Sequence, residues 1–214
     1  DARGSATLAA ACERFGARLL TFSSDAVFDG TKGGPYLESD APNPQSTLGR
    51  IQREAELEVL GRLPGALVVR SSTPFGPWDG HNFAARVLRE LEQGRPFRAA
   101  ADQIVSPTYL PDLAHACLDL LQDEESGLWH LANQGALTPA ACARELAKLA
   151  RLDCSLVREV RTADRPLGGA LGSARGQFGL AAGLTLGQVL AVLFLLRLAL
   201  HHGRNRTGSP AAAN

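Results

Sequence analysis

Short apolar runs alternate along this chain with longer segments whose apolar residues recur at helical spacing. The apolar runs have the length of buried strands and stand at residues 19–22, 66–69, 97–100, 128–131 and 156–160. The segments with helical periodicity stand at residues 1–15, 46–63, 82–93, 111–121 and 138–150. Alternation of strand and helix is typical of a parallel sheet covered by helices, so the pattern predicts an α/β fold.

The spacing of apolar residues also predicts which side of a helix faces the sheet. In the helix at 1–15 the inward side is expected to hold Leu8, Ala9, Cys12 and Phe15. In the helix at 46–63 it is expected to hold Leu48, Ile51, Ala55 and Leu57 or Val59. Both assignments assume that apolar side chains alone determine the buried side.

Polar residues directly follow the first two apolar runs. Ser23, Ser24 and Asp25 come after the run at 19–22, and hydroxyl residues 71–73 come shortly after the run at 66–69. Open α/β sheets bind their ligands at the carboxyl ends of parallel strands. A long loop rich in glycine and proline then follows, and loops of that length are usually functional. The sequence therefore predicts a ligand site at the end of the strand 19–22.

Composition and charge exclude some classes of function. Lys plus Arg number 22, and so do Asp plus Glu, so no basic excess is present to meet the phosphates of nucleic acid. The four cysteines form neither a C-x-x-C pair nor a cluster with histidine. We therefore expect reduced thiols in a cytoplasmic protein, and no metal site.

Both ends of the chain have unusual features. The chain begins at Asp1 and contains no Met, which predicts a fragment or a processed chain, and no secretory signal is visible. Residues 184–200 are strongly apolar but include Gln188 and Arg197. We favour a helix that docks on the domain over a membrane span, which needs about 20 apolar residues. Residues 201–214 are polar and small, and we expect them to be disordered.

Several motifs resemble those of one enzyme family. Residues 23–44 read SSDAVFDGTKGGPYLESDAPNP, and later segments read VVRSSTPFGPWDGHNF, DQIVSPTYLPDLA, GLWHLAN and RPLGGAL. In this order they resemble the dTDP-4-dehydrorhamnose reductases, extended short-chain dehydrogenase/reductases that reduce a keto sugar on a nucleotide with NADPH. The resemblance covers residues 1–176 and identifies the chain as a member of that family.

The resemblance implies the C-terminal half of a Rossmann-like fold. We expect a partial parallel sheet with a small substrate-binding lobe, lacking the N-terminal Gly-rich half of the family. In the strand order 3-2-1-4-5-6, strands 4, 5 and 6 would remain as a contiguous block. We accordingly expect a sugar-nucleotide-binding domain at 1–176, an apolar helix at 177–200 and a tail at 201–214. The strand 19–22 would form a bare edge through which copies of the chain could associate, and the fold would be marginally stable.

The resemblance also implies a catalytic apparatus, of which this chain lacks a part. In the family a Tyr protonates the developing alkoxide, a Lys four residues later lowers its pKa and binds the cofactor ribose, and a Ser or Thr hydrogen-bonds the carbonyl. Here the Ser/Thr position is Ser24, but the Tyr position is Leu48 and the Lys position is Gln52. NADP(H) is the family's cofactor, and Ser23, Ser24 and Asp25 stand nearest to it, but we do not expect this chain alone to bind it.

The positions that meet the nucleotide sugar in the family match its motifs better than the Tyr and Lys positions do. They are Asn82, Gln103, Ser106, Thr108 and Arg165. Arg165 suits either a pyrophosphate contact or a surface salt bridge. We expect structural roles for His81 and His130, and we expect Asp25 and Asp29 to accept hydrogen bonds from backbone amides of a turn.

Three functions remain open. The parent protein would be an NADPH-dependent reductase of a dTDP-4-keto-sugar. Alternatively, the chain is a non-catalytic binding or regulatory subunit, a role for which the beta subunit of methionine adenosyltransferase, which resembles the same family, is a precedent. It could also be a fragment without function. Because Leu48 and Gln52 cannot supply a proton, we expect a chain that binds a dTDP-sugar and does not catalyse, with neither a nucleic-acid nor a membrane partner.

Overall fold

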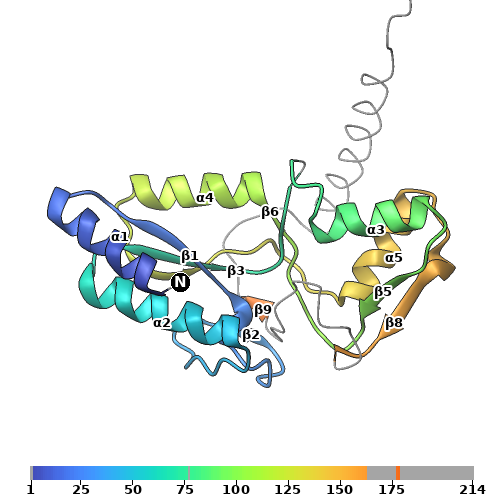
Figure 1. The fold of residues 1–214 in the computed structure, drawn as a ribbon, viewed down its shortest axis with the longest axis horizontal. Helices are drawn as coiled ribbons and strands as arrows, with labels where there is room; N and C mark the ends of the chain where they lie inside the picture. The colour runs from blue at the N-terminus through green and yellow to red at the C-terminus, as the bar shows by residue number, and fades with distance from the viewer. Residues whose placement is uncertain (1, 77, 163–176, 179–214) are drawn as a thin grey trace, which may run out of the picture.

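A parallel sheet with helices on both faces forms the larger part of the molecule, and a smaller lobe lies to one side (Figure 1). The computed structural model describes residues 2–76, 78–162 and 177–178. In chain order the elements are α1 (Ala2–Phe15), β1 (Leu20–Ser24), η1 (Asp25–Val27), β2 (Pro35–Tyr36), α2 (Thr47–Arg62), β3 (Leu67–Ser71), β4 (Pro74–Phe75), α3 (Phe83–Glu92), β5 (Phe97–Ala100), β6 (Thr108–Tyr109), α4 (Leu110–Gln122), β7 (Gly127–His130), α5 (Pro139–Leu149), η2 (Cys154–Leu156), β8 (Val157–Val160) and β9 (Gln177–Phe178).

The main sheet has three parallel strands in the order β1-β3-β7. In Figure 1, α4 covers one face of this sheet, and α1 and α2 cover the other. Side chains of β3 alternate between the two faces. Val69 packs with Leu113 of α4, whereas Val68 packs with Val59 of α2. The predicted α/β fold with a contiguous block of parallel strands is confirmed.

The small lobe consists of α3, β5, α5 and β8, at the right of Figure 1. Strands β5 and β8 pair in parallel, with Phe97 opposite Val157. Leu88 of α3 and Leu146 of α5 are buried in the same cluster as these two residues. The chain enters the lobe after β4, leaves it for α4 and β7, and returns with α5. The lobe is therefore built from two separate stretches of the sequence, and elements of the main sheet lie between them.

The buried side of α2 differs from the predicted one. Leu48, Ile51 and Leu57 are 50%, 38% and 56% exposed, so the prediction that they face the sheet is wrong, whereas Val59 is fully buried. The buried side instead includes Glu56, which is 2% exposed. A charged residue therefore occupies a sheet-facing position, and Ile51 and Leu57 lie on sides of the helix that face solvent.

Three further apolar residues, in α1 and β1, lie outside the core, against expectation. Phe15 of α1 is 77% exposed and Leu8 is 51% exposed, whereas Ala9 is fully buried, because α1 packs closely through its small residues. Phe22 of β1 is 58% exposed, which differs from the buried position that its apolar run suggests and agrees with the bare edge expected for the strand 19–22. Within the described residues β1 pairs only with β3, and it therefore forms an edge of this sheet. Association of copies through that edge stays a prediction.

Most predicted elements lie within one or two residues of the observed ones. The strand at 97–100 has the predicted bounds, while the strand predicted at 128–131 is β7, at Gly127–His130. The sequence pattern did not predict η1 or β2, which interrupt the long loop. The range 177–200, expected as a helix, begins with β9, and its remainder lies outside the described residues, as does the tail at 201–214.

Within the part of the chain that the structure describes, no helix has the length and apolar character needed to cross a membrane.

A buried ion pair joins α2 to the sheet. Arg70 of β3 donates from Nε to Glu56 Oε1 at 2.7 Å and from Nη2 to Oε2 at 2.6 Å. Ser23 of β1 donates to Oε1 at 2.6 Å, and Arg53 donates to Oε2 at 3.1 Å. Burial opposes ionisation of Glu56, but the hydrogen bonds and the charge of Arg70 hold its pKa below the ordinary value. Glu56 is therefore a carboxylate that ties three elements together.

His130 of β7 extends this network to the loop that follows η1. Its Nε2 lies 3.3 Å from Arg70 Nη1, and its Nδ1 lies 3.2 Å from the carbonyl oxygen of Tyr36. A neutral imidazole that accepts at Nε2 and donates from Nδ1 satisfies both contacts. The ring of Phe28 packs edge-on against His130 and lies under the Arg70 guanidinium, at 5.0 Å. The expected structural role of His130 agrees with these contacts.

Removing the negative charge of Glu56 should destabilise the protein strongly. We expect Glu56→Gln to lower the free energy of unfolding by about 3 kcal/mol, because the guanidinium of Arg70 would stay buried without a countercharge. Glu54→Gln, at an exposed position of the same helix, is the matched control and should change it by less than about 0.5 kcal/mol. Urea unfolding followed by circular dichroism measures both, and equal effects would contradict the role of the ion pair.

His130 should make stability depend on pH in a defined direction. Burial lowers its pKa from 6.5 to about 4, so between these values the unfolded chain binds a proton that the folded chain does not. The stabilisation is complete above about pH 6.5 and is lost as the pH falls towards 4. The stability difference between the wild type and His130→Gln should therefore shrink by on the order of 2 kcal/mol across this range.

The exposed His115 of α4 offers the control, because His115→Gln removes a histidine without touching the buried network. Chemical denaturation at a series of pH values compares the two variants. A difference for His130→Gln that stays constant with pH would show that the buried imidazole is not held neutral.

Candidate functional site

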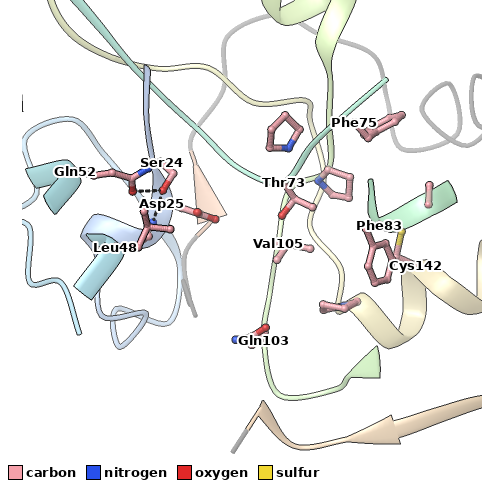
Figure 2. Close-up of a pocket in the computed structure, with 15 residues that line it drawn as sticks. Ser24, Asp25, Leu48, Gln52, Thr73, Phe75, Phe83, Gln103, Val105 and Cys142 are labelled. Atoms are coloured by element: carbon pink, nitrogen blue, oxygen red, sulfur yellow. Dashed lines mark hydrogen bonds between the residues drawn. The ribbon is translucent and has the colours of Figure 1, made fainter. Parts of the chain in front are cut away.

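A cavity of about 220 Å³ lies where the carboxyl end of β1 faces the small lobe. Ser24, Asp25, Leu48 and Gln52 form one wall, and Thr73, Val105, Phe83 and Cys142 lie on the opposite wall (Figure 2). The first group belongs to β1, η1 and α2, whereas the second comes from the lobe and the segments leading to it. The predicted ligand position at the end of the strand 19–22 therefore coincides with a cavity.

The hydroxyl group of Ser24 is engaged within the protein. Its Oγ donates to Gln52 Oε1 at 2.6 Å and accepts from the amide of Ala26 at 3.1 Å, where Ser24 caps η1 (Figure 2). The proton of this hydroxyl is therefore directed at the amide of Gln52. To hydrogen-bond a carbonyl in the cavity, Ser24 would first have to give up that bond.

Leu48 and Gln52 stand on the cavity side of α2. They are four residues apart, which places them next to each other on one side of the helix. A leucine has no proton to donate, and a primary amide has no pKa near neutrality. At these two positions the wall therefore offers an alkyl group and an amide, neither of which can act as an acid or a base near neutral pH.

Asp25 is the carboxyl group that this wall does contain. It is 8% exposed, and its Oδ2 accepts from Ser72 Oγ at 2.6 Å. Burial raises its pKa from 3.8 to about 7, against the lowering effect of the Ser72 hydrogen bond and of the Asp25 and Ala26 amides. The expectation that Asp25 serves only backbone amides is thus incomplete, because its side-chain partner is a serine at the end of the neighbouring strand.

Asp29 agrees with its expected role in a turn. It accepts hydrogen bonds from the amide of Thr31 at 2.9 Å, from the Tyr36 hydroxyl at 2.8 Å and from the Asn43 amide group at 2.8 Å. These bonds, the Thr31 amide first among them, hold the pKa of Asp29 well below its usual range. Asp29 therefore orders the loop and is not among the cavity-lining residues.

The predicted substrate-binding residues divide into two groups. Gln103 is 3% exposed and lines the cavity on the lobe side (Figure 2). Asn82 instead caps α3, with its Oδ1 accepting from the amide of Ala85 at 2.9 Å. Thr108 donates to the carbonyl oxygen of Ser106 at 3.0 Å. Asn82, Ser106 and Thr108 are all buried, and the side chains of Asn82 and Thr108 bond protein partners. Arg165 lies outside the described residues.

Sequence reasoning did not find the apolar half of the cavity. Phe75, Phe83 and Val105 line it, together with Pro139 and Cys142. An apolar residue beside a cavity follows the same sequence pattern as one in a core, so no periodicity distinguishes them. Thr73 can be recognised as a candidate site residue only from the structure. Its φ of 42° is unusual for a β-branched residue, and backbone strain of this kind clusters at binding sites.

The residues present do not fit a complete nicotinamide cofactor site. The sequence has no Gly-rich G-x-x-G-x-x-G turn to hold a pyrophosphate. Gln52, where the family resemblance leads us to expect a lysine, carries no charge, and its side-chain oxygen accepts a hydrogen bond from Ser24. The hydroxyl group of Ser23 donates to Glu56 and is therefore not directed at a cofactor in the cavity. Among the residues that the structure describes, no cluster of His, Cys, Asp or Glu has the form of a metal site.

Comparison with known proteins gives consistent matches. The family model for the RmlD substrate binding domain matches residues 1–170. A dTDP-4-dehydrorhamnose reductase of Mycobacterium tuberculosis (strain ATCC 25618 / H37Rv) is 38% identical over 172 residues, which are 78% of this chain and 56% of that protein. The chain thus spans about half the length of the curated relatives it matches.

Solved structures match the fold. The crystal structure of a dTDP-4-dehydrorhamnose reductase from Clostridium acetobutylicum has a TM-score of 0.77 at 26% identity, covering 92% of this chain and 71% of that one. A dTDP-4-dehydrorhamnose reductase from Bacillus anthracis in complex with NADP has a TM-score of 0.76 at 24% identity, covering 92% and 70%. The second match supports the fold alone.

The first turn of α2 lies directly against η1, and this contact shapes the cavity wall. A Cβ atom added at Gly49 would lie 2.0 Å from the carbonyl oxygen of Ala26. Only glycine allows the helix to approach so closely. The approach brings Leu48 and Gln52 to the same wall as Ser24 and Asp25.

Gly49→Ala should therefore be destabilising, although alanine is the better helix former. We expect a loss of about 2 kcal/mol from the forced displacement of α2. Gly61→Ala is the matched control, since a Cβ at Gly61 in the same helix meets no atom within 4 Å. It should gain up to about 1 kcal/mol from helix propensity. Thermal melts of both variants test the contact, and a neutral Gly49→Ala variant would disprove it.

Proposed function

We propose that this chain, which belongs to the RmlD substrate binding domain family, binds a nucleotide sugar of the dTDP class. The observation that carries the proposal is the cavity beside Ser24, Asp25 and Gln103, which combines the end of a parallel strand with the small lobe. Ligands of open α/β sheets occupy this position. The proposed unit is residues 1–176, and we place it in the cytoplasm because all four cysteines are free thiols.

The dimensions of the cavity favour the sugar as the enclosed part of the ligand. Its volume of about 220 Å³ is below the roughly 300–1,000 Å³ typical of sites that enclose a whole ligand. The apolar lining residues include Ala26, Leu48 and Val105 from both walls. They suit a deoxysugar, because the methyl group of such a sugar needs no hydrogen-bond partner. In this proposal the nucleotide extends out of the cavity.

We further propose that the chain by itself binds and does not reduce. Support comes from Leu48 and Gln52, which supply no proton, and from Ser24, whose hydroxyl donates to Gln52. NADP(H) remains the cofactor of the family, and this chain alone is not proposed to bind it. These substitutions favour a non-catalytic binding subunit over the parent reductase activity.

The bare edge at β1 gives such a subunit a place to associate. Phe22 is 58% exposed there, and within the described residues β1 has a strand partner on one side only, β3. We include pairing between copies of the chain through this edge as part of the proposal.

Calorimetric titration with dTDP-glucose tests the proposed binding. Saturable heat is expected with wild type, and Gln103→Ala should weaken binding about tenfold, because a buried polar contact on the cavity wall is removed. Gln93→Ala, at an exposed position after α3, should bind like wild type. Absence of saturable binding would refute the proposal. NADPH oxidation by the chain in the presence of a dTDP-4-keto-6-deoxy-sugar would refute its non-catalytic part.

A further inference from the structure

Among the residues that the structure describes, no cation pairs with the buried carboxyl group of Asp25, whose only side-chain partner there is Ser72. Asp25 is 8% exposed and lies on the cavity wall at the end of β1. In Figure 2 its side chain points from this end towards the wall that carries Thr73 and Val105. A ligand that fills the cavity must therefore meet this group.

The groups around Asp25 fix its position without neutralising it. Ser72, at the end of β3, donates to Oδ2 at 2.6 Å, and the Ser72 oxygen lies 3.4 Å from the amide of Ser106 in the lobe-side loop. The other polar side chains of the cavity wall are Ser24 from β1, Gln52 from α2, and Thr73 and Gln103 from the segments that flank the lobe. All of them are neutral.

The nearby charged groups are engaged elsewhere. Glu56 and Arg70 bond one another, with Ser23 and Arg53 completing the carboxylate's contacts. Burial raises the pKa of Asp25 to about 7, and the groups that oppose this rise are the Ser72 hydroxyl and backbone amides, all of them neutral. An apolar cavity with neutral walls favours the neutral acid over the carboxylate. Asp25 in this form carries a proton that it can share with a ligand.

The competing hydroxyl donor on the same wall is already used. Ser24 directs its hydrogen at Gln52, and Leu48 has none to offer. We propose that Asp25 is a specificity-determining residue which, as a neutral acid, donates a hydrogen bond to a carbonyl oxygen of the bound sugar and so selects keto sugars. This inference rests on the proposed function, because it assumes that a nucleotide sugar enters the cavity.

The proposed hydrogen bond has a signature that a purely structural carboxyl would lack. A carbonyl oxygen only accepts hydrogen bonds, so it needs the neutral acid. A sugar hydroxyl can also donate, so it is able to bind the carboxylate. Raising the pH should therefore weaken binding of a keto sugar and spare binding of its hydroxyl counterpart. His130, with a pKa near 4, stays neutral throughout and does not confuse the comparison.

The experiment is calorimetric titration of the full chain with a dTDP-4-keto-6-deoxy-hexose and with dTDP-glucose, at about pH 6 and about pH 8.5. For the keto sugar we expect affinity to fall about tenfold or more between these values, as the fraction of neutral Asp25 falls. For dTDP-glucose we expect a change of less than about threefold. Equal pH dependence of the two ligands would overturn the inference.

Two variants separate the hydrogen bond from the fold. Asp25→Asn keeps an N–H donor and an acceptor for Ser72, so keto-sugar binding should persist and lose its pH dependence. Asp25→Leu removes the donor and should bind the keto sugar about tenfold more weakly at the lower pH. Glu58→Gln, an exposed position on α2, should keep the wild-type pH profile. Retained pH dependence in Asp25→Asn would overturn the assignment to this carboxyl group.

The outcomes also distinguish this inference from the proposed function. If wild type binds neither dTDP compound at either pH, both fail together. If both compounds bind with pH-independent affinity, the nucleotide-sugar site stands and the role of Asp25 fails. Circular dichroism melts of the variants show whether a loss of binding reflects a loss of folding, and Asp25→Asn supplies the decisive comparison if Asp25→Leu does not fold.

Discussion

The ion pair between Glu56 and Arg70 is the constraint on which the rest of the structure depends. Both side chains are almost fully buried, and a carboxylate there requires its guanidinium and its hydroxyl donor in fixed positions. This requirement sets the rotation of α2 about its own axis. Residues 48, 52 and 56 follow one another at four-residue intervals, so the pair that holds Glu56 to β3 also aims Gln52 and Leu48 at the cavity.

The same constraint keeps the hydroxyl group of Ser24 engaged. Because α2 cannot rotate without breaking the ion pair, Gln52 remains beside Ser24 and accepts a hydrogen bond from its hydroxyl. Gly49 permits the close approach of helix and strand end that this contact needs. Ser24, Leu48 and Gln52 are therefore held on one wall of the cavity, which offers an alkyl group and an amide beside the hydroxyl.

Two buried carboxyl groups near the end of β1 show how environment determines charge. Glu56 meets a guanidinium and stays ionised despite burial, with its pKa below the ordinary value. Asp25 meets only neutral donors, and burial raises its pKa to about 7. One group is thereby suited to hold the fold together and the other to meet a ligand, although the sequence contains nothing that distinguishes a carboxyl group of one kind from the other.

The sequence alone determined the order of strands and helices and the family. These properties lie in local periodicity and in motifs of adjacent residues, which the folded structure does not alter. The tertiary structure decided which side of α2 is buried, because the partner of Glu56 is on another strand and apolar spacing carries no information about it. It also decided the lobe-side wall of the cavity and the environment of Asp25, since both depend on contacts between residues far apart in the chain.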